Sequence, residues 1–187
     1  MVSHLDHFSC IAPYYDSIFR RPDADSLLAW VAPAADHRLL DVGGGTGRVA
    51  QHLLAHVAEV HILDPSLGMV REGQRKGIRA IQGDAEHMPF GQGAFDRVVV
   101  VDTFHHLRDQ RMAVRELLRV LAPGGRLVIE EPDIARGSVK LVSAVEKLAG
   151  MRSHFLPLDV VRSLFQHAGS QARVERQGYV GWVIVEV

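Results

Sequence analysis

This sequence of 187 residues has one cysteine, almost no net charge and no long apolar run. Its single cysteine, Cys10, cannot form an internal disulfide, and its N-terminus lacks the layout of a secretory signal. Its 21 basic and 22 acidic residues leave a formal charge of -1, which gives no general attraction to a phosphate backbone. No apolar run approaches the ~18 residues of a membrane-spanning helix. We therefore expect a cytoplasmic protein that has no transmembrane segment and does not bind nucleic acid.

The length and composition predict one folded domain. A chain with 47% hydrophobic and 23% charged residues is ordinary for a globular protein, and its length allows a core without disulfides or metal. We expect a single domain over residues 1–187. Two N-terminal helices, Ala12–Phe19 and Ala24–Val31, are expected to form a cap within residues 1–36. The sequence does not indicate the oligomeric state.

Short runs of Val, Ile and Leu alternate with segments of helical periodicity, which predicts a doubly wound α/β sheet with helices on both faces. The predicted strands are His37–Val42, Ala58–Asp64, Arg79–Gln82, Phe95–Val101, Arg126–Glu130, Ala172–Arg176 and Tyr179–Val187. The last two are too close for a crossover helix, so we expect an antiparallel hairpin at Gln177-Gly178 and a mixed sheet.

Two further helices are indicated by apolar residues at helical spacing. The first carries Val114, Leu117, Leu118 and Leu121 and is expected to stop at Ala122-Pro123-Gly124-Gly125. The second carries Leu158, Val161, Leu164, Phe165 and Ala168 and is expected to end at Gly169. The segment between them, residues 133–154, has no clear pattern.

The strongest local signal is a buried strand that ends in the glycine-rich turn Gly43, Gly44, Gly45 and Gly47. Glycines allow a ligand to approach the backbone closely. The dinucleotide fingerprint G-x-G-x-x-G would require glycine where this chain has Arg48, and Asp41 before the turn suits a cation better than a pyrophosphate. A nicotinamide oxidoreductase is therefore disfavoured. A packing turn in which Asp41 caps a helix or loop stays as the alternative.

Two more carboxylates follow the next strands. Asp64 lies 21 positions after Gly43, the spacing at which a carboxylate binds ribose hydroxyls, or else it caps the helix that starts near Ser66. Asp84 follows the third strand and could accept the adenine amino group. Acidic side chains at successive strand ends repel a pyrophosphate but tolerate a sulfonium and an ammonium. This pattern favours S-adenosylmethionine as the ligand.

Together, these segments resemble class I S-adenosylmethionine-dependent methyltransferases, especially the group of ubiquinone and menaquinone C-methyltransferases (methyltransferase type 11). The matching segments are Tyr14-Tyr15-Asp16, Leu40–Gly47, Asp64-Pro65-Ser66 with Met69, Gly83-Asp84-Ala85, Phe95-Asp96, Asp102-Thr103-Phe104-His105-His106 and Leu118–Gly125. The resemblance implies a Rossmann-like, seven-stranded sheet with its last strand antiparallel. It also implies S-adenosylmethionine as methyl donor and S-adenosylhomocysteine as product.

The resemblance further implies a cofactor-binding role for the matching residues. The methionine moiety would face Asp41 and the backbone of Gly43, Gly44, Gly45 and Gly47, and its amino group would approach the main chain of Asp102 and Thr103. The ribose would bind Asp64, and the adenine would contact Pro65, Met69, Gly83, Asp84 and the Ala85 amide. Tyr15 would close over the cofactor.

The end of the fourth strand bears on the methyl acceptor. It reads Asp-Thr-Phe-His-His and lacks the Asn/Asp-Pro-Pro-Tyr motif of enzymes that methylate bases or protein glutamine, which favours a small molecule. The acceptor atom is oxygen, nitrogen or carbon, and a phenolic or quinone-like compound is one option. A quinone stays open because Ser170 stands where the family often has an aromatic residue. The alternative is a catalytically silent S-adenosylmethionine-binding protein that acts as a sensor or partner subunit.

Methyl transfer needs alignment and exclusion of water more than acid–base groups. His105, His106 and Tyr15 are candidates for a base, although packing roles are favoured, and the adjacent histidines should point in different directions. We expect Glu130-Glu131-Pro132-Asp133 to be a solvated strand end rather than to line a cleft. We assign no metal, because no histidines have the H-E-x-x-H spacing.

Overall fold

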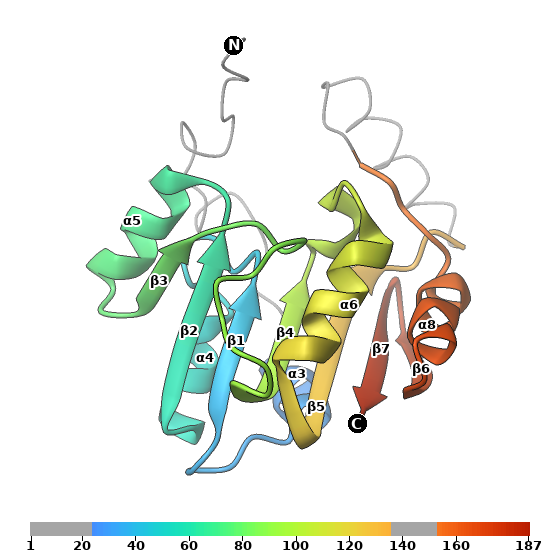
Figure 1. Cartoon of the computed structure of the whole chain (residues 1–187), viewed down its shortest axis with the longest axis horizontal. Coiled ribbons are helices and arrows are strands. Elements are labelled where there is room, and N and C mark those ends of the chain that lie inside the picture. Colours follow the sequence, from blue (N-terminus) through green and yellow to red (C-terminus); the bar gives the residue numbers. More distant parts are fainter. Residues whose placement is uncertain (1–23, 136–152) are drawn as a thin grey trace, which may run out of the picture.

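The computed structural model describes residues 24–135 and 153–187, which fold around a seven-stranded sheet of order β3-β2-β1-β4-β5-β7-β6 (Figure 1). The strands are β1 (Arg38–Val42), β2 (Glu59–Asp64), β3 (Arg79–Gln82), β4 (Phe95–Val101), β5 (Leu121–Pro132), β6 (Gln171–Gln177) and β7 (Val180–Glu186). The first five pair in parallel, and β7 runs antiparallel to β5 and β6. This confirms the predicted mixed sheet and its C-terminal hairpin.

Helices cover both faces of the sheet, as predicted. The helices are α3 (Ala24–Val31), α4 (Ala50–Leu53), α5 (Leu67–Arg75), α6 (Gln110–Val120) and α8 (Leu158–His167), with the short 3-10 turns η2 (Leu54–His56) and η3 (Phe104–His106). The core residues of α6 and α8 pack on one face, and those of α3, α4 and α5 pack on the other (Figure 1). The predicted helix Ala12–Phe19 and Tyr15 lie outside the described residues.

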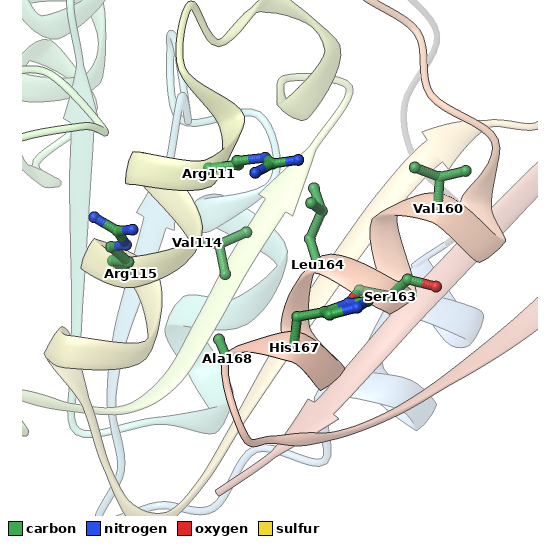
Figure 2. A pocket seen from close by; sticks show the side chains of 8 residues that line it. All are labelled: Arg111, Val114, Arg115, Val160, Ser163, Leu164, His167 and Ala168. Atoms are coloured by element: carbon green, nitrogen blue, oxygen red, sulfur yellow. The ribbon is translucent and has the colours of Figure 1, made fainter.

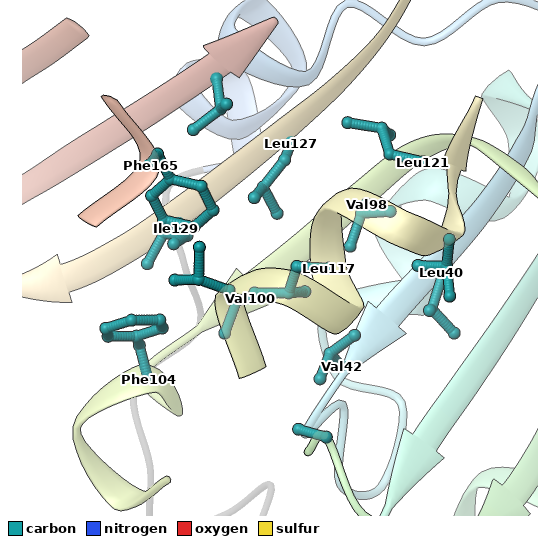
Figure 3. Packing of buried hydrophobic residues seen from close by; sticks show 14 of the residues in the cluster. Leu40, Val42, Val98, Val100, Phe104, Leu117, Leu121, Leu127, Ile129 and Phe165 are labelled. Carbon is teal, nitrogen blue, oxygen red and sulfur yellow. The ribbon is translucent and has the colours of Figure 1, made fainter. Parts of the chain in front are cut away.

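Strand β4 shows why this chain contains continuous apolar runs. Its residues Val98 and Val100 pack under α6 and α8, whereas Val99 and Val101 pack against the opposite layer of helices. Figure 3 shows the first of these layers, in which Leu117 and Phe165 meet the strand residues. This part of the strand is buried on both faces and has no polar face to alternate with, so residues Val98–Val101 are all apolar.

The largest difference from the predicted boundaries lies at the start of β5, and the other strand ends differ from their predictions by at most two residues. Helix α6 ends at Val120, and Leu121 already pairs with Phe95 of β4, so the Ala122–Gly125 segment lies inside β5. The helical pattern included Leu121 because this side chain is buried, and burial alone does not distinguish the last helical residue from the first strand residue. The predicted helix stop at Gly169 and the predicted hairpin turn at Gln177-Gly178 are confirmed, and both glycines have positive φ, +89° and +63°.

Candidate functional site

Four aspartates gather at one edge of the sheet because the carboxyl ends of parallel strands point the same way. Asp41 lies in β1 and Asp64 ends β2, while Asp84 and Asp102 follow β3 and β4. The strand order reverses between β1 and β4, and ligands of open α/β sheets bind at such a switch point. The structure thus brings together the carboxylates that the sequence singled out.

The glycine turn lies directly against the loop after β4. Gly43, Gly45 and Gly47 have φ values of +69°, +57° and +82°, which side chains rarely adopt. A Cβ on Gly43 would lie 2.1 Å from Cγ2 of Thr103, and a Cβ on Gly47 would lie 2.6 Å from Cδ1 of Ile78. The turn therefore needs glycine for its backbone conformation and for its packing.

Asp41 is a buried carboxylate, with 1% of its surface exposed. Among the described residues, neither of its oxygens meets a donor at hydrogen-bonding geometry. Burial raises the pKa of Asp41 to about 7; the Arg48 charge and the Ala50 amide oppose this rise, and the Asp64 charge adds to it. The N-cap position of α4 is Val49, which makes no side-chain hydrogen bond, and Asp41 interacts with this helix only through the Ala50 amide. A buried, unsatisfied carboxylate at a switch point is a marker of a ligand site.

Arg48 borders the same small cavity as Asp41. The cavity measures about 30 Å³ and is lined by Asp41, Gly43, Gly44, Gly45, Arg48, Val49, Val101 and Thr103. Arg48 is only 8% exposed, and its Nη2 lies 3.8 Å from Oδ2 of Asp102. Thr103 closes the cavity by donating a hydrogen bond from Oγ1 to the Gly43 carbonyl at 3.2 Å. Sequence reasoning took Arg48 only as a departure from the dinucleotide fingerprint and missed its place here.

The Asp64 carboxylate connects the glycine turn to the loop before α5 through hydrogen bonds. Its Oδ2 accepts a hydrogen bond from the Gly45 amide at 2.9 Å, and its Oδ1 accepts one from the Ser66 amide at 2.9 Å. The N-cap of α5 is Ser66, whose Oγ accepts from the Met69 amide, so Asp64 is not the cap that the sequence allowed. Met69 is buried next to the turn, whereas Pro65 is exposed.

The segment after β3 forms a compact turn around Asp84. The Gly83 amide donates to the Asp64 carbonyl at 3.1 Å, and a Cβ on Gly83 would lie 2.5 Å from Cδ1 of Leu63. Asp84 is exposed, and its Oδ1 accepts from the Glu86 amide at 2.9 Å. Partial burial opposes ionisation, but this hydrogen bond and others lower the pKa of Asp84 below its ordinary value. Ala85 beside it is buried.

A buried histidine–glutamate pair lies beyond Thr103. Nδ1 of His105 is 2.5 Å from Oε2 of Glu131, and the Phe104 amide donates to Oε1 of the same carboxylate at 2.8 Å. His105 and Glu131 are 4% and 5% exposed. The His105 ring stacks on Phe155, with ring centroids 4.0 Å apart and planes at 13°.

The expectation of a solvated end for β5 is therefore wrong. Glu130, Glu131 and Asp133 are all buried. Oε2 of Glu130 accepts from Nε1 of Trp182 at 3.1 Å, and Oδ2 of Asp133 lies 3.5 Å from Nε of Arg176. These partners are distant in sequence, which is why an acidic run that looks like a solvated strand end lies inside the protein.

The two adjacent histidines differ in their electrostatic surroundings. Their ring centroids are 4.0 Å apart, so the expectation that the side chains point in different directions is wrong. Both residues lie in η3, a single tight turn. Burial, and then the positive charge of His105, lowers the pKa of His106 to about 3.

A larger groove lies elsewhere, between α6 and α8 (Figure 2). It measures about 420 Å³ and is lined by Arg111, Val114, Arg115, Val160, Ser163, Leu164, His167 and Ala168. Arg111 extends across it toward Leu164 in Figure 2. This groove is far less suited to a sulfonium ligand than the strand ends, because its lining has two arginines and no carboxylate.

Sequence comparison identifies the family. A family model described as a methyltransferase domain matches residues 40–129, from β1 to β5. A demethylmenaquinone methyltransferase of Thermus thermophilus is 37% identical over 154 residues, which cover 74% of this chain and 70% of that protein. The chain belongs to the S-adenosylmethionine-dependent methyltransferases. This family uses S-adenosylmethionine as its methyl donor.

Other relatives extend the comparison to quinone-modifying enzymes. The ubiquinone/menaquinone biosynthesis C-methyltransferase of Roseobacter denitrificans is 31% identical over 141 residues, 66% of this chain and 56% of that protein. A demethylmenaquinone methyltransferase of Clavibacter sepedonicus is 39% identical over 106 residues and is covered over 43% of its length. Apart from the Thermus enzyme, this methyltransferase spans about half the length of these curated relatives.

Solved structures confirm the class I methyltransferase fold. An S-adenosylmethionine-dependent methyltransferase of Thermotoga maritima superimposes with a TM-score of 0.80 at 21% identity, covering 96% of this chain and 97% of that one. A chain from the Haloferax volcanii complex of a methyltransferase with its Trm112 activator reaches 0.84 at 16% identity, covering 97% of each chain. At these identities the likeness establishes the fold alone.

The described residues contain neither a membrane-spanning helix nor a cluster of metal ligands. No helix within 24–135 or 153–187 is long and apolar enough to cross a membrane. The same residues contain no group of three or more His, Cys, Asp or Glu side chains that could hold a metal ion.

Proposed function

We propose that this methyltransferase transfers the methyl group of S-adenosylmethionine to a phenolic or quinone-like small molecule. The main support for S-adenosylmethionine as methyl donor is Asp41. Its carboxylate is 1% exposed and accepts no hydrogen bond from the described residues. A cationic ligand group at the turn would compensate this charge. The donor carries two cationic groups, its ammonium and its sulfonium, and therefore fits the site.

We propose that the other strand-end residues bind the rest of the donor. The two Asp64 oxygens already accept backbone hydrogen bonds, but an ionised carboxylate has about four lone-pair sites and can also accept from ribose hydroxyls. Pro65 and Met69 would contact the adenine face, and Asp84 with the Ala85 amide would bind its edge. The main chain of Asp102 and Thr103 would approach the methionine amino group.

The proposal that the methyl acceptor is a phenolic or quinone-like molecule rests on His105 and Glu131. A phenol or an acidic carbon has to lose a proton before or during methyl transfer, and a histidine held by a carboxylate is suited to receive it. Glu131 fixes the ring of His105 through a 2.5 Å contact at Nδ1. The similarity to a demethylmenaquinone methyltransferase supports an acceptor with an acidic ring hydroxyl or ring carbon.

A second candidate is a methyltransferase that works only with a partner subunit. The observation that favours it is the fold likeness to a methyltransferase of Haloferax volcanii that was solved with its Trm112 activator. This candidate predicts weak or absent turnover by the isolated chain and normal turnover once the partner is supplied.

The experiment is calorimetric titration of the purified protein with S-adenosylmethionine, S-adenosylhomocysteine and NADH. We expect micromolar binding of both sulfur ligands and no binding of NADH. Phenols and quinols would then be screened as acceptors by release of S-adenosylhomocysteine. Absence of binding of either sulfur ligand would refute the donor assignment, and binding without turnover on any acceptor would favour the partner-dependent candidate.

A further inference from the structure

Strand β6 (Gln171–Gln177) forms one edge of the sheet. It pairs only with β7, so its other side faces no strand of residues 24–135 or 153–187 (Figure 1). None of the β6 residues is buried, whereas the central residues of β7 all are. An edge strand presents a row of backbone N–H and C=O groups to which another chain can pair. With seven residues, β6 is a longer edge than the four-residue β3.

The β6 sequence Gln-Ala-Arg-Val-Glu-Arg-Gln is complementary in charge to a second copy of itself. Two copies that pair antiparallel about a two-fold axis at Val174 have Arg173 of each copy directly opposite Glu175 of the other. Opposite charges at such positions stabilise an antiparallel pair. The side chains of Arg173 and Glu175 are 47% and 42% exposed, and Nε of Arg173 lies 3.7 Å from Oε1 of Glu175 on the same face of the sheet. Both side chains are therefore accessible to a second strand.

Charge also disfavours the neighbouring registers. A shift that keeps each side chain on its own face of the sheet moves the axis from Val174 to Arg173 or to Glu175. The first shift places two arginines directly opposite each other, and the second places two glutamates there. Like charges at directly opposite positions destabilise the pair. The sequence of this edge thus favours the register centred on Val174.

The two ends of β6 carry an exposed aromatic residue and a pocket. Tyr179, in the turn after β6, is 47% exposed. The pocket at the start of β6 measures about 480 Å³ and is lined by Gly169, Ser170, Gln171, Glu186 and Val187. Tyr179 and Gly169 lie five positions on either side of Val174. An axis at Val174 therefore brings the Tyr179 turn of each copy to the pocket end of the other.

We propose that the β6 edge binds a second copy of this chain, as an antiparallel strand pair centred on Val174 that joins the two sheets into one. Such a contact is isologous, because the same residues of both copies form it, and it closes as a dimer. In the strand order, β5 and β7 lie between β6 and the switch point at β1 and β4. The dimer contact is therefore separate from the donor site.

The test is sedimentation velocity of wild type, Arg173→Glu, Glu175→Arg and an equimolar mixture of these two variants. We expect wild type to form a dimer of the 20.7 kDa chain. Each variant alone should self-associate roughly tenfold to a hundredfold more weakly, because like charges then meet across the axis. The mixture should restore the dimer, since each arginine of one variant then opposes a glutamate of the other.

The matched control is Arg79→Glu, which makes the same change of charge on β3, the opposite edge of the sheet. The Arg79 side chain is 65% exposed, and this variant should dimerise as wild type does. Tyr179→Ala should weaken the dimer by roughly tenfold, because the ring no longer contacts the second copy. Hydrogen exchange of wild type at low and high protein concentration needs no variant, and the β6 amides should become more protected as concentration rises.

A wild type that stays monomeric up to about 1 mM would overturn the proposal. Dimers that persist unchanged in both folded single variants would overturn it as well, because the contact would then lie on another surface. A mixture of folded variants that stays monomeric would overturn the register centred on Val174. Exchange of the β6 amides that does not depend on concentration would overturn the β6 contact even if a variant fails to fold.

Discussion

Two neighbouring regions of this methyltransferase each contain a buried carboxylate, but the two carboxylates differ in their hydrogen-bond partners. In the donor edge, defined as Asp41, Arg48 and turn residues 43–47, the Asp41 oxygens lack a hydrogen-bond donor among the described residues. In the strand-four loop, residues 103–106, the Glu131 carboxylate accepts from the Phe104 amide and pairs with His105. The Glu131 carboxylate is thus satisfied within the folded chain, whereas the Asp41 carboxylate is buried without a hydrogen bond, which is the basis of the donor site proposed above.

The largest expected effect concerns the pH dependence of stability at Asp41. Its pKa is raised from 3.8 to about 7 in the folded protein, so the native state binds more protons than the unfolded state between these values. The free energy of unfolding contributed by this group therefore falls as pH rises from about 4 to 7, by about 4 kcal/mol in total. Asp41→Asn cannot ionise, so the variant should be more stable than wild type at pH 8 yet bind S-adenosylmethionine more weakly.

Urea unfolding of both proteins from pH 4 to 8 measures this difference. Calorimetry at pH 6 in buffers of different ionisation enthalpy adds an independent check, because a cationic donor should displace close to one proton from Asp41. Parallel stability curves for the two proteins, or donor binding without proton release, would show that Asp41 is not the ligand-facing group.

Substitution of Glu131 should have the opposite effect on stability. Glu131→Ala leaves the Phe104 amide and the His105 ring buried without their acceptor, and we expect the free energy of unfolding to fall by about 3 kcal/mol. The matched control is Glu186→Ala, whose side chain is 47% exposed and forms ion pairs with Arg126 and Arg173, so its cost should stay below about 1 kcal/mol. Similar urea midpoints for the two variants would contradict the framework role of Glu131.

Substitutions of His105 and His106 should have different effects on turnover. We expect His105→Gln to lower kcat by roughly a hundredfold and to remove the acidic limb of the pH–rate profile, with unchanged donor affinity. The pKa of His106 is about 3, so this ring stays neutral above pH 5, and His106→Gln should leave the shape of the profile unchanged. Turnover is measured as S-adenosylhomocysteine release with an acceptor from the screen. Identical profiles for His105→Gln and wild type would return His105 to a packing role.

The fold was predictable to a large extent because its signals are local. Strands Arg79–Gln82 and Phe95–Val101 and helix Ala24–Val31 have the predicted bounds, since apolar runs and helical spacing record burial residue by residue. The position of Arg48 beside Asp41 and the contacts of Glu131 were not predictable in this way. Glu131 meets His105, a partner 26 positions away, and no spacing in the sequence marks such a pair. An acidic run that continues an apolar strand is the one signal that could have indicated it.

The smallest expected effects concern Asp64 and Asp84, the acids at the ends of the neighbouring strands. Asp64→Ala should weaken S-adenosylmethionine binding by roughly tenfold to a hundredfold, because it removes a ribose acceptor and also releases the Gly45 amide that holds the turn. Asp84→Ala should weaken binding by only about tenfold, since Asp84 is exposed and organises its own loop through the Glu86 amide. The control is Asp36→Ala, which removes the same charge from an exposed site just before β1, at the opposite edge of the sheet. If calorimetry finds equal donor affinity in all three variants, the effect is one of net charge and not of position, and Asp64 and Asp84 are not specific contacts of the donor.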